Sequence, residues 1–261
     1  MDLGLAGKRA LVVGASQGLG RASAVALLGE GAHVVGAARS AAKIEAWRGA
    51  LPADQAARLS VSALDLADPA SVDRLADALL ADGGVDVLIN NCGGPAPGGV
   101  LDTAEGTWAK AFASMAASVF HLTDRLVRPM LERGWGRVIT IGSSGVVQPI
   151  PNLAVSNAIR GSVAGWSKSL ADEVAGRGVT VNMVLPGRVA TERLESLDQS
   201  RAGKQNLDLD EVRRRSQAEI PAGRYGTPEE FAAVVAFLAS APAAYVTGSM
   251  IRVDGGLIRG L

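Results

Sequence analysis

The sequence predicts an α/β protein: a single-domain Rossmann fold with a doubly wound, seven-stranded parallel sheet and helices on both faces. Short apolar runs alternate with longer helical patterns along the 261 residues. The runs are almost continuously apolar, as expected of parallel strands covered on both faces. Such alternation favours a doubly wound sheet. The expected strands are 9–14, 32–37, 58–65, 85–90, 136–142, 179–185 and 249–253.

The composition narrows the class of protein. Hydrophobic residues make up 48% of the chain, enough for a sizeable core, and the 26 Lys and Arg balance the 26 Asp and Glu. This balance gives no sign of a nucleic-acid or membrane-surface partner. A single cysteine, Cys92, excludes an internal disulfide and a cysteine metal cluster, so no metal site is expected. With no signal peptide and no membrane-length apolar run, we expect a cytoplasmic protein.

Helix signals separate the expected strands. Asp68 before Pro69 is typical of an N-cap followed by a first-turn proline, and Thr227 has capping-box spacing to Glu230. Since no linker or repeat interrupts the pattern, residues 1–261 are expected to form one NAD(P)-binding domain. The stretch 188–206 has an irregular pattern and runs into an expected helix at 208–219, so we expect a substrate lid at about 188–219.

A glycine-rich turn, GASQGLG, follows the first expected strand and precedes a helix. Glycines there let the backbone approach a pyrophosphate, to which the helix N-terminus offers amide donors. A tight turn without a ligand is the alternative interpretation. At the end of the second strand, Ala38 stands where an NAD site favours an acid, and Arg39 follows. A guanidinium there favours the 2′-phosphate of NADP over NAD, although a solvated strand-end arginine is a competing interpretation.

Six motifs in order give the chain a family resemblance. It resembles the short-chain dehydrogenases/reductases, and among them the 3-oxoacyl-(acyl-carrier-protein) reductases, over nearly its whole length. The motifs are GASQGLG (14–20), NNCGG (90–94), IGSS (141–144), LPGRVAT (185–191), GRYGTPEE (223–230) and YVTGSMIRVDGG (245–256).

The resemblance implies roles for particular residues and a homodimer or homotetramer, because relatives pair the helix that carries Ser156 with a second subunit. It also implies a small-molecule substrate. Arg188 and Arg193, near the expected nicotinamide, could close on cofactor phosphates or an anionic substrate, or form lid salt bridges. The implied cofactor-binding residues are Gly14, Ser16, Gln17, Gly18, Leu19, Gly20, Arg39, Asp65, Leu66, Asn90, Asn91, Gly93, Pro186, Gly187, Val189 and Thr191.

The catalytic positions depart from the family pattern of Asn, Ser, Tyr and Lys. The serine matches Ser143, but Ser156 stands at the tyrosine position and Arg160 at the lysine position. Met115 occupies the asparagine position. The chain's two tyrosines, Tyr225 and Tyr245, fall inside other motifs.

These departures remove the usual proton relay, because serine is far less acidic than tyrosine and arginine keeps its proton. Ser156 and Arg160, four apart on one helix, share a face and are expected to meet Ser143. The first hypothesis is an NADP(H)-dependent oxidoreductase with Ser143, Ser156 and Arg160 as an atypical catalytic set. In it Ser143 and Ser156 orient the substrate, Arg160 anchors the cofactor ribose or a substrate anion, and water supplies the proton. The alternatives are a non-catalytic NADP-binding sensor or subunit and, less favoured, a relative of the halohydrin dehalogenases.

Overall fold

One parallel sheet of seven strands runs through the molecule, as the sequence predicts. The computed structural model describes residues 1–260. Strand order is β3-β2-β1-β4-β5-β6-β7, and every neighbouring pair is parallel. The order reverses between β1 and β4, which opens a crevice at the carboxyl ends of these strands. The strands are β1 (Arg9–Val13), β2 (His33–Ala38), β3 (Leu59–Ala63), β4 (Val87–Asn90), β5 (Gly136–Ile141), β6 (Val179–Pro186) and β7 (Met250–Val253).

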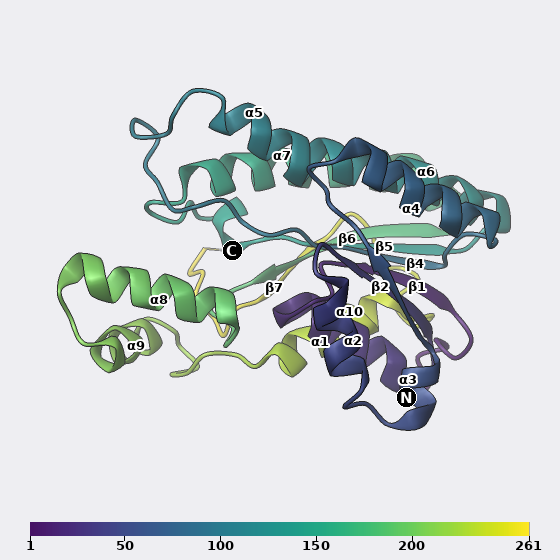
Figure 1. Ribbon diagram of the computed structural model, residues 1–261, viewed down its shortest axis with the longest axis horizontal. Helices are drawn as coiled ribbons and strands as arrows, with labels where there is room; N and C mark the ends of the chain where they lie inside the picture. Colours follow the sequence, from purple (N-terminus) through teal and green to yellow (C-terminus); the bar gives the residue numbers. More distant parts are fainter. Residues whose placement is uncertain (261) are drawn as a thin grey trace.

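Helices cover both faces of the sheet (Figure 1). Helices α1, α2 and α10 pack on one face, and α4, α6 and α7 pack on the other. The helices are α1 (Gly18–Gly29), α2 (Ala41–Arg48), α3 (Ala53–Ala57), α4 (Pro69–Ala81), α5 (Thr107–Phe112), α6 (Ser118–Arg133), α7 (Ala154–Val174), α8 (Glu192–Gln205), α9 (Leu209–Ala218) and α10 (Pro228–Ala239).

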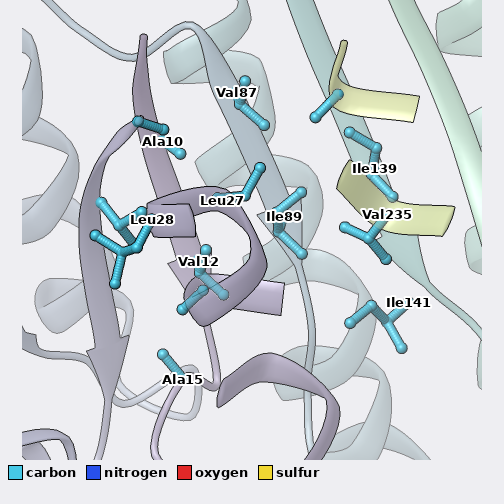
Figure 2. Packing of buried hydrophobic residues seen from close by; sticks show 14 of the residues in the cluster. Ala10, Val12, Ala15, Leu27, Leu28, Val87, Ile89, Ile139, Ile141 and Val235 are labelled. Atoms are coloured by element: carbon cyan, nitrogen blue, oxygen red, sulfur yellow. The ribbon is translucent and has the colours of Figure 1, made fainter. Parts of the chain in front are cut away.

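The core divides into two layers because consecutive strand residues point to opposite faces. In β1, Ala10 and Val12 belong to the cluster beneath α1, whereas Leu11 and Val13 belong to the cluster beneath α4 and α6. Figure 2 shows Leu27 and Leu28 of α1 lying over the first of these layers. The continuous apolar character of the strands thus reflects burial on both sides.

Both predicted helix caps are confirmed. The Asp68 carboxylate accepts a hydrogen bond from Ala70 N at 3.0 Å, with Pro69 as the first residue of α4. Thr227 Oγ1 accepts from Glu230 N at 3.2 Å, and Glu230 Oε2 accepts from Thr227 N at 2.8 Å. This reciprocal pair fixes the start of α10 directly after the GRYG motif.

The lid segment differs from the sequence-based expectation. Residues 192–205, expected to be irregular, form the helix α8, while the helix expected at 208–219 is confirmed as α9. Thr191 caps α8 through its hydroxyl, and Asn206 ends it in a left-handed conformation, φ 50°. The helix was missed because its apolar residues are too sparse to show helical periodicity. Helices α8 and α9 lie together at one end of the sheet (Figure 1).

Membrane spans and metal clusters are both missing from residues 1–260. None of the helices there is both long and apolar enough to cross a membrane. These residues also hold no group of three or more His, Cys, Asp or Glu side chains that could share a metal ion.

The capping box predicts an acid-sensitive contribution to stability. Glu230 forms an ion pair with Arg224 and accepts a hydrogen bond from the Thr227 backbone. These two interactions hold the pKa of Glu230 at about 2, below the ordinary 4.5. A depressed folded-state pKa stabilises the protein above the unfolded-state value, and this stabilisation is lost as the pH falls through the folded-state value. We therefore expect Glu230→Gln to destabilise the protein above pH 4.5, and the difference from wild type to shrink between about pH 4.5 and 2.

Urea unfolding across this pH range measures the effect. Glu229→Gln is the matched control, because Glu229 lies in the same helical turn and makes no hydrogen bond within the described chain. A wild-type advantage over Glu230→Gln that stays constant down to the lowest pH would contradict the assignment.

Candidate active site

The glycine-rich turn between β1 and α1 is too tight for side chains at two of its positions. A Cβ on Gly20 would lie 2.2 Å from Gly14 O, and one on Gly14, φ +69°, would lie 2.6 Å from Asn91 Nδ2. Glycine at these positions lets α1 start directly against the end of β1. Asn91 in turn donates to Gly14 O at 3.4 Å, which ties the turn to the end of β4.

The start of α1 is open to an anion. Its N-cap, Gln17, makes no side-chain cap bond, and the first turn carries no acidic residue. The first backbone N–H groups of a helix have no partner within the helix, so they are left to solvent or a ligand. Trp47 Nε1 donates to Ala15 O at 3.1 Å and braces the turn from α2. Ser16 and Leu19, predicted cofactor contacts, lie within this turn and first helical residues.

Two cations lie beside this turn at the end of β2. Arg39 is exposed and makes no hydrogen bond or ion pair with any residue in 1–260. Lys43 Nζ donates to Gln17 Oε1 at 2.8 Å. Sequence reasoning missed Lys43, although its position one helical turn after Arg39 was a usable signal. The predicted residue Asp65 accepts a hydrogen bond from Ala67 N at 2.9 Å, and Leu66 O accepts one from Ser118 Oγ.

The turn after β6 carries the remaining predicted cofactor residues. Gly187, which follows Pro186, lies close to Asp254, the residue after β7, because a Cβ built on Gly187 would be 2.6 Å from Asp254 Cα. Val189 forms a parallel bridge with Gly226 of the GRYG motif. Thr191 then caps α8, and its methyl group faces Gly18, 3.6 Å from a Cβ built there. The turn thus reaches from the end of the sheet to the glycine-rich loop.

The two serines lie where β5 ends and α7 begins. Ser143 follows β5, and its Oγ accepts from Gly145 N at 3.1 Å, which leaves its proton free to donate. Ser156 lies in the first turn of α7, is 8% exposed, and makes no hydrogen bond within residues 1–260. Asn157 secures the intervening turn by two hydrogen bonds with Ile150, at 3.2 and 2.9 Å. Sequence reasoning missed this residue.

Arg160, one turn along α7 from Ser156, holds two strand ends together. Its Nη1 donates to Ile141 O at 3.1 Å and Gly142 O at 3.2 Å, at the end of β5. Its Nη2 donates to Cys92 O at 3.3 Å, just beyond β4. Three of the five guanidinium N–H groups are therefore committed to backbone carbonyls, and Nε–H together with one Nη2–H is left for a ligand.

The chain is similar to known proteins over nearly its whole length. A family model described as Enoyl-(Acyl carrier protein) reductase matches residues 14–258. The chain is 38% identical to a 3-oxoacyl-[acyl-carrier-protein] reductase of Vibrio cholerae over 258 residues, 98% of this chain and 99% of the relative. It is 39% identical to the Escherichia coli protein of that name over 255 residues, 96% of this chain and 97% of the relative. The chain belongs to the short-chain dehydrogenase/reductase family.

Solved structures agree with this family assignment. L-sorbose reductase from Gluconobacter frateurii, complexed with NADPH and L-sorbose, superposes with a TM-score of 0.94 at 30% identity over the full length of both chains. A variant of actinorhodin polyketide ketoreductase with NADPH gives 0.90 at 33% identity, over 96% of this chain and 97% of that chain.

Within this family member, the asparagine position is apolar. Met115 is 6% exposed and lies in a π-helical turn, Ala113–Ala117, between α5 and α6. Behind Arg160 is a cavity of about 10 Å³, lined in part by Met115 and Arg160. Asn90 Oδ1 and Thr140 Oγ1, both in residues lining it, are buried without a hydrogen-bond partner in the described part of the chain. A cavity of this size accommodates about one water molecule.

Neither tyrosine contacts the candidate catalytic residues. Tyr225 donates its hydroxyl to Asp198 Oδ2 at 2.8 Å in the lid, and burial raises its pKa. Tyr245 is fully exposed before β7. Within residues 1–260, no tyrosine hydroxyl bonds to Ser143, Ser156 or Arg160.

Removing Arg160 is predicted to destabilise the fold at the site. Arg160→Gln leaves three backbone carbonyls without their charged donor, so we expect a loss of about 2–4 kcal/mol in the free energy of unfolding. Arg160→Lys keeps the charge but lacks the planar fork that bridges both strand ends, so it recovers only part of this loss. Urea unfolding compares both with Arg177→Gln, an exposed arginine of the same charge. Equal stability of Arg160→Gln and Arg177→Gln would contradict the stabilising role of the three Arg160 hydrogen bonds.

Proposed function

We propose that this protein is an oxidoreductase that transfers hydride between NADP(H) and a small carbonyl or imine-type substrate, without a tyrosine–lysine proton relay. The observation that carries the proposal is the grouping of two serines and a guanidinium at the carboxyl ends of β4 and β5, close to the glycine-rich turn. Reductases with bound NADPH among the similar structures support the choice of cofactor.

The residues present fit a dinucleotide. The glycine-rich turn and the uncapped start of α1 suit a pyrophosphate, and Gly93 has open space where a Cβ would stand. Arg39 and Lys43 would hold the 2′-phosphate, with Asp65 and Leu66 at the adenine. The further residues proposed to bind the cofactor are Gly14, Ser16, Gln17, Gly18, Leu19, Gly20, Asn91, Gly93, Pro186, Gly187, Val189 and Thr191.

NADPH, when bound, supplies a hydride to the carbon of the substrate's C=O or C=N group. Ser143, whose oxygen already accepts from Gly145 N, is free to donate its proton in a hydrogen bond to the substrate oxygen or nitrogen, and Ser156 would act as a second donor. These donors stabilise the negative charge that develops there. Water then supplies the proton that completes the alcohol or amine, because neither serine nor arginine releases one readily.

One observation favours a second function, a nucleotide-binding protein without catalysis. Arg160 is largely committed to backbone carbonyls, and no acidic side chain replaces the tyrosine. Such a protein would bind NADPH and reduce nothing. A dehalogenase-like reaction is less favoured, because the glycine-rich turn remains intact.

We further propose that the outer face of α7 packs against a second copy of the chain. Gly161 and Gly165 are exposed, and a Cβ on either would meet nothing within 4 Å. A surface of such small residues lets another helix approach closely, which supports a homodimer or homotetramer.

Cofactor preference is predicted to depend on Arg39 and Lys43. Replacing both with alanine removes two cations from the 2′-phosphate, so we expect the Kd for NADPH to rise about 10-fold or more while that for NADH changes little. Fluorescence titration measures both constants, with Arg48→Ala on the outside of α2 as the control. Equal weakening of NADPH and NADH by the double variant would contradict the 2′-phosphate assignment.

Turnover is predicted to depend on Ser143. With NADPH and a panel of ketones, imines and 3-oxoacyl thioesters, Ser143→Ala should lower kcat by about 100-fold or more, the effect of losing one oxyanion donor. Its NADPH affinity should be unchanged. Stopped-flow absorbance at the nicotinamide band follows hydride transfer directly. If the wild-type protein binds NADPH tightly yet reduces no member of the panel, the non-catalytic function is correct instead.

A further inference from the structure

The loop that follows β4 forms one wall of the candidate site and is held at three points. Arg160 donates to Cys92 O at its start, and Arg193 Nη2 donates to Pro95 O at 2.9 Å in its middle. At its end, Gly98 O accepts from Ala154 N at 3.1 Å, two residues before Ser156. The loop therefore links Arg193 of α8 to Arg160 and to the start of α7, which carries Ser156.

Arg193 occupies an unfavourable position for a cation. It lies in the first turn of α8, where the helix dipole favours negative charge. Neither acidic neighbour in that turn pairs with it: Glu195 binds Arg213, and Glu192 faces the glycine-rich turn. Its bond to Pro95 O uses one of its five N–H groups, and the others have no partner within residues 1–260. An arginine placed there contributes little to the stability of the helix.

Arg160 also lies close enough to affect Arg193. Partial burial of the Arg193 guanidinium lowers its pKa, and the positive charge of Arg160 lowers it further. No carboxylate within residues 1–260 forms an ion pair with either one. Arg188 contrasts with them, because it donates to Glu219 Oε2 at 2.7 Å and also binds Ser216. Of the two, Arg188 and Arg193, only Arg193 has a guanidinium that is not paired with a carboxylate within residues 1–260.

The orientation of α8 separates this cation from the cofactor phosphates. The α8 residue that faces the glycine-rich turn is acidic: Glu192 Oε2 lies 3.7 Å from a Cβ built on Gly18. Arg193, the next residue, points instead to the loop after β4, with its Nη2 3.2 Å from a Cβ built on Gly94. Consecutive helix residues project in different directions, so the two side chains face different segments of the chain.

We propose that Arg193, assisted by the free N–H groups of Arg160, binds a carboxylate carried by the substrate. This inference rests on the proposed function and narrows its substrate to an oxo acid or the corresponding imino acid. The planar fork of Arg193 matches the two oxygens of a carboxylate, while Ser143 and Ser156 receive the reacting oxygen or nitrogen. Because Arg193 belongs to the lid, binding this carboxylate also holds α8 against the loop.

The test measures binding to the NADP⁺ complex, in which no reduction occurs. The probes are 2-, 3- and 4-oxo acids of four to six carbons, each paired with its methyl ester, and calorimetry gives their Kd values. We expect at least one acid to bind about 10- to 100-fold more tightly than its ester, as a charge-assisted pair of hydrogen bonds predicts. Arg193→Gln should reduce this preference to below about 3-fold, and Arg193→Lys should retain part of it.

Arg214→Gln is the matched control, because it removes the same charge from an exposed lid arginine that binds only Glu211. It should leave the acid preference unchanged, and Arg193→Gln should leave the Kd for NADPH within about 2-fold. The proposal is overturned by equal binding of every acid and its ester, or by a preference that survives Arg193→Gln. It is also overturned if Arg193→Gln weakens NADPH as much as the acid.

Failure of the proposed function would be seen separately. Wild-type protein that binds neither NADPH nor NADP⁺ defeats the assignment of the cofactor. Normal nucleotide binding without any preference for acids overturns the carboxylate site alone.

Discussion

The guanidinium of Arg160 determines the shape of the candidate site, because it joins the ends of two neighbouring strands. Parallel strands diverge beyond their last ladder hydrogen bond, and the carbonyls there have no partner in the sheet. Arg160 supplies donors to three of them, at Cys92, Ile141 and Gly142. The loop after β4, the turn that carries Ser143 and the start of α7 are therefore held in one arrangement. A lysine, with a single nitrogen, has no equivalent geometry.

In this arrangement, the three departures from the family pattern that the sequence resemblance predicts are mutually consistent. Arg160 reaches the strand ends directly, and Met115, expected at the asparagine position, contributes an apolar side chain to the small cavity beside it. Once the cation is bound to carbonyls, a tyrosine at position 156 would have lost the neighbour that makes its hydroxyl acidic. A small hydroxyl at that position leaves more room for substrate. These features are consistent with the proposed function, in which the pocket polarises the substrate and water supplies the proton.

Sequence patterns predicted the sheet and its caps well, and the lid poorly. The strands were found because burial on both faces requires uninterrupted apolar runs, and Asp68 and Thr227 were found because capping depends on local spacing. Helix α8 was missed because its stability comes from Thr191, Asn206 and packing on α9, which leave little apolar periodicity. The sequence also could not predict that Arg188 and Arg193 would have different partners. The packing of α9 brings Glu219 to Arg188, whereas Arg193 is left without a carboxylate partner in the described chain.

Helix α8 presents two adjacent residues to two different segments of the chain, with Glu192 toward the glycine-rich turn and Arg193 toward the loop after β4. A helix moves as a rigid body, so a shift of α8 when the proposed nucleotide binds beside Glu192 would also displace Arg193. Binding at one of these places would then alter affinity at the other, and thermodynamic reciprocity makes the effect equal in both directions. Such heterotropic coupling, carried by one turn of one helix, would make the affinity for each ligand depend on whether the other is bound.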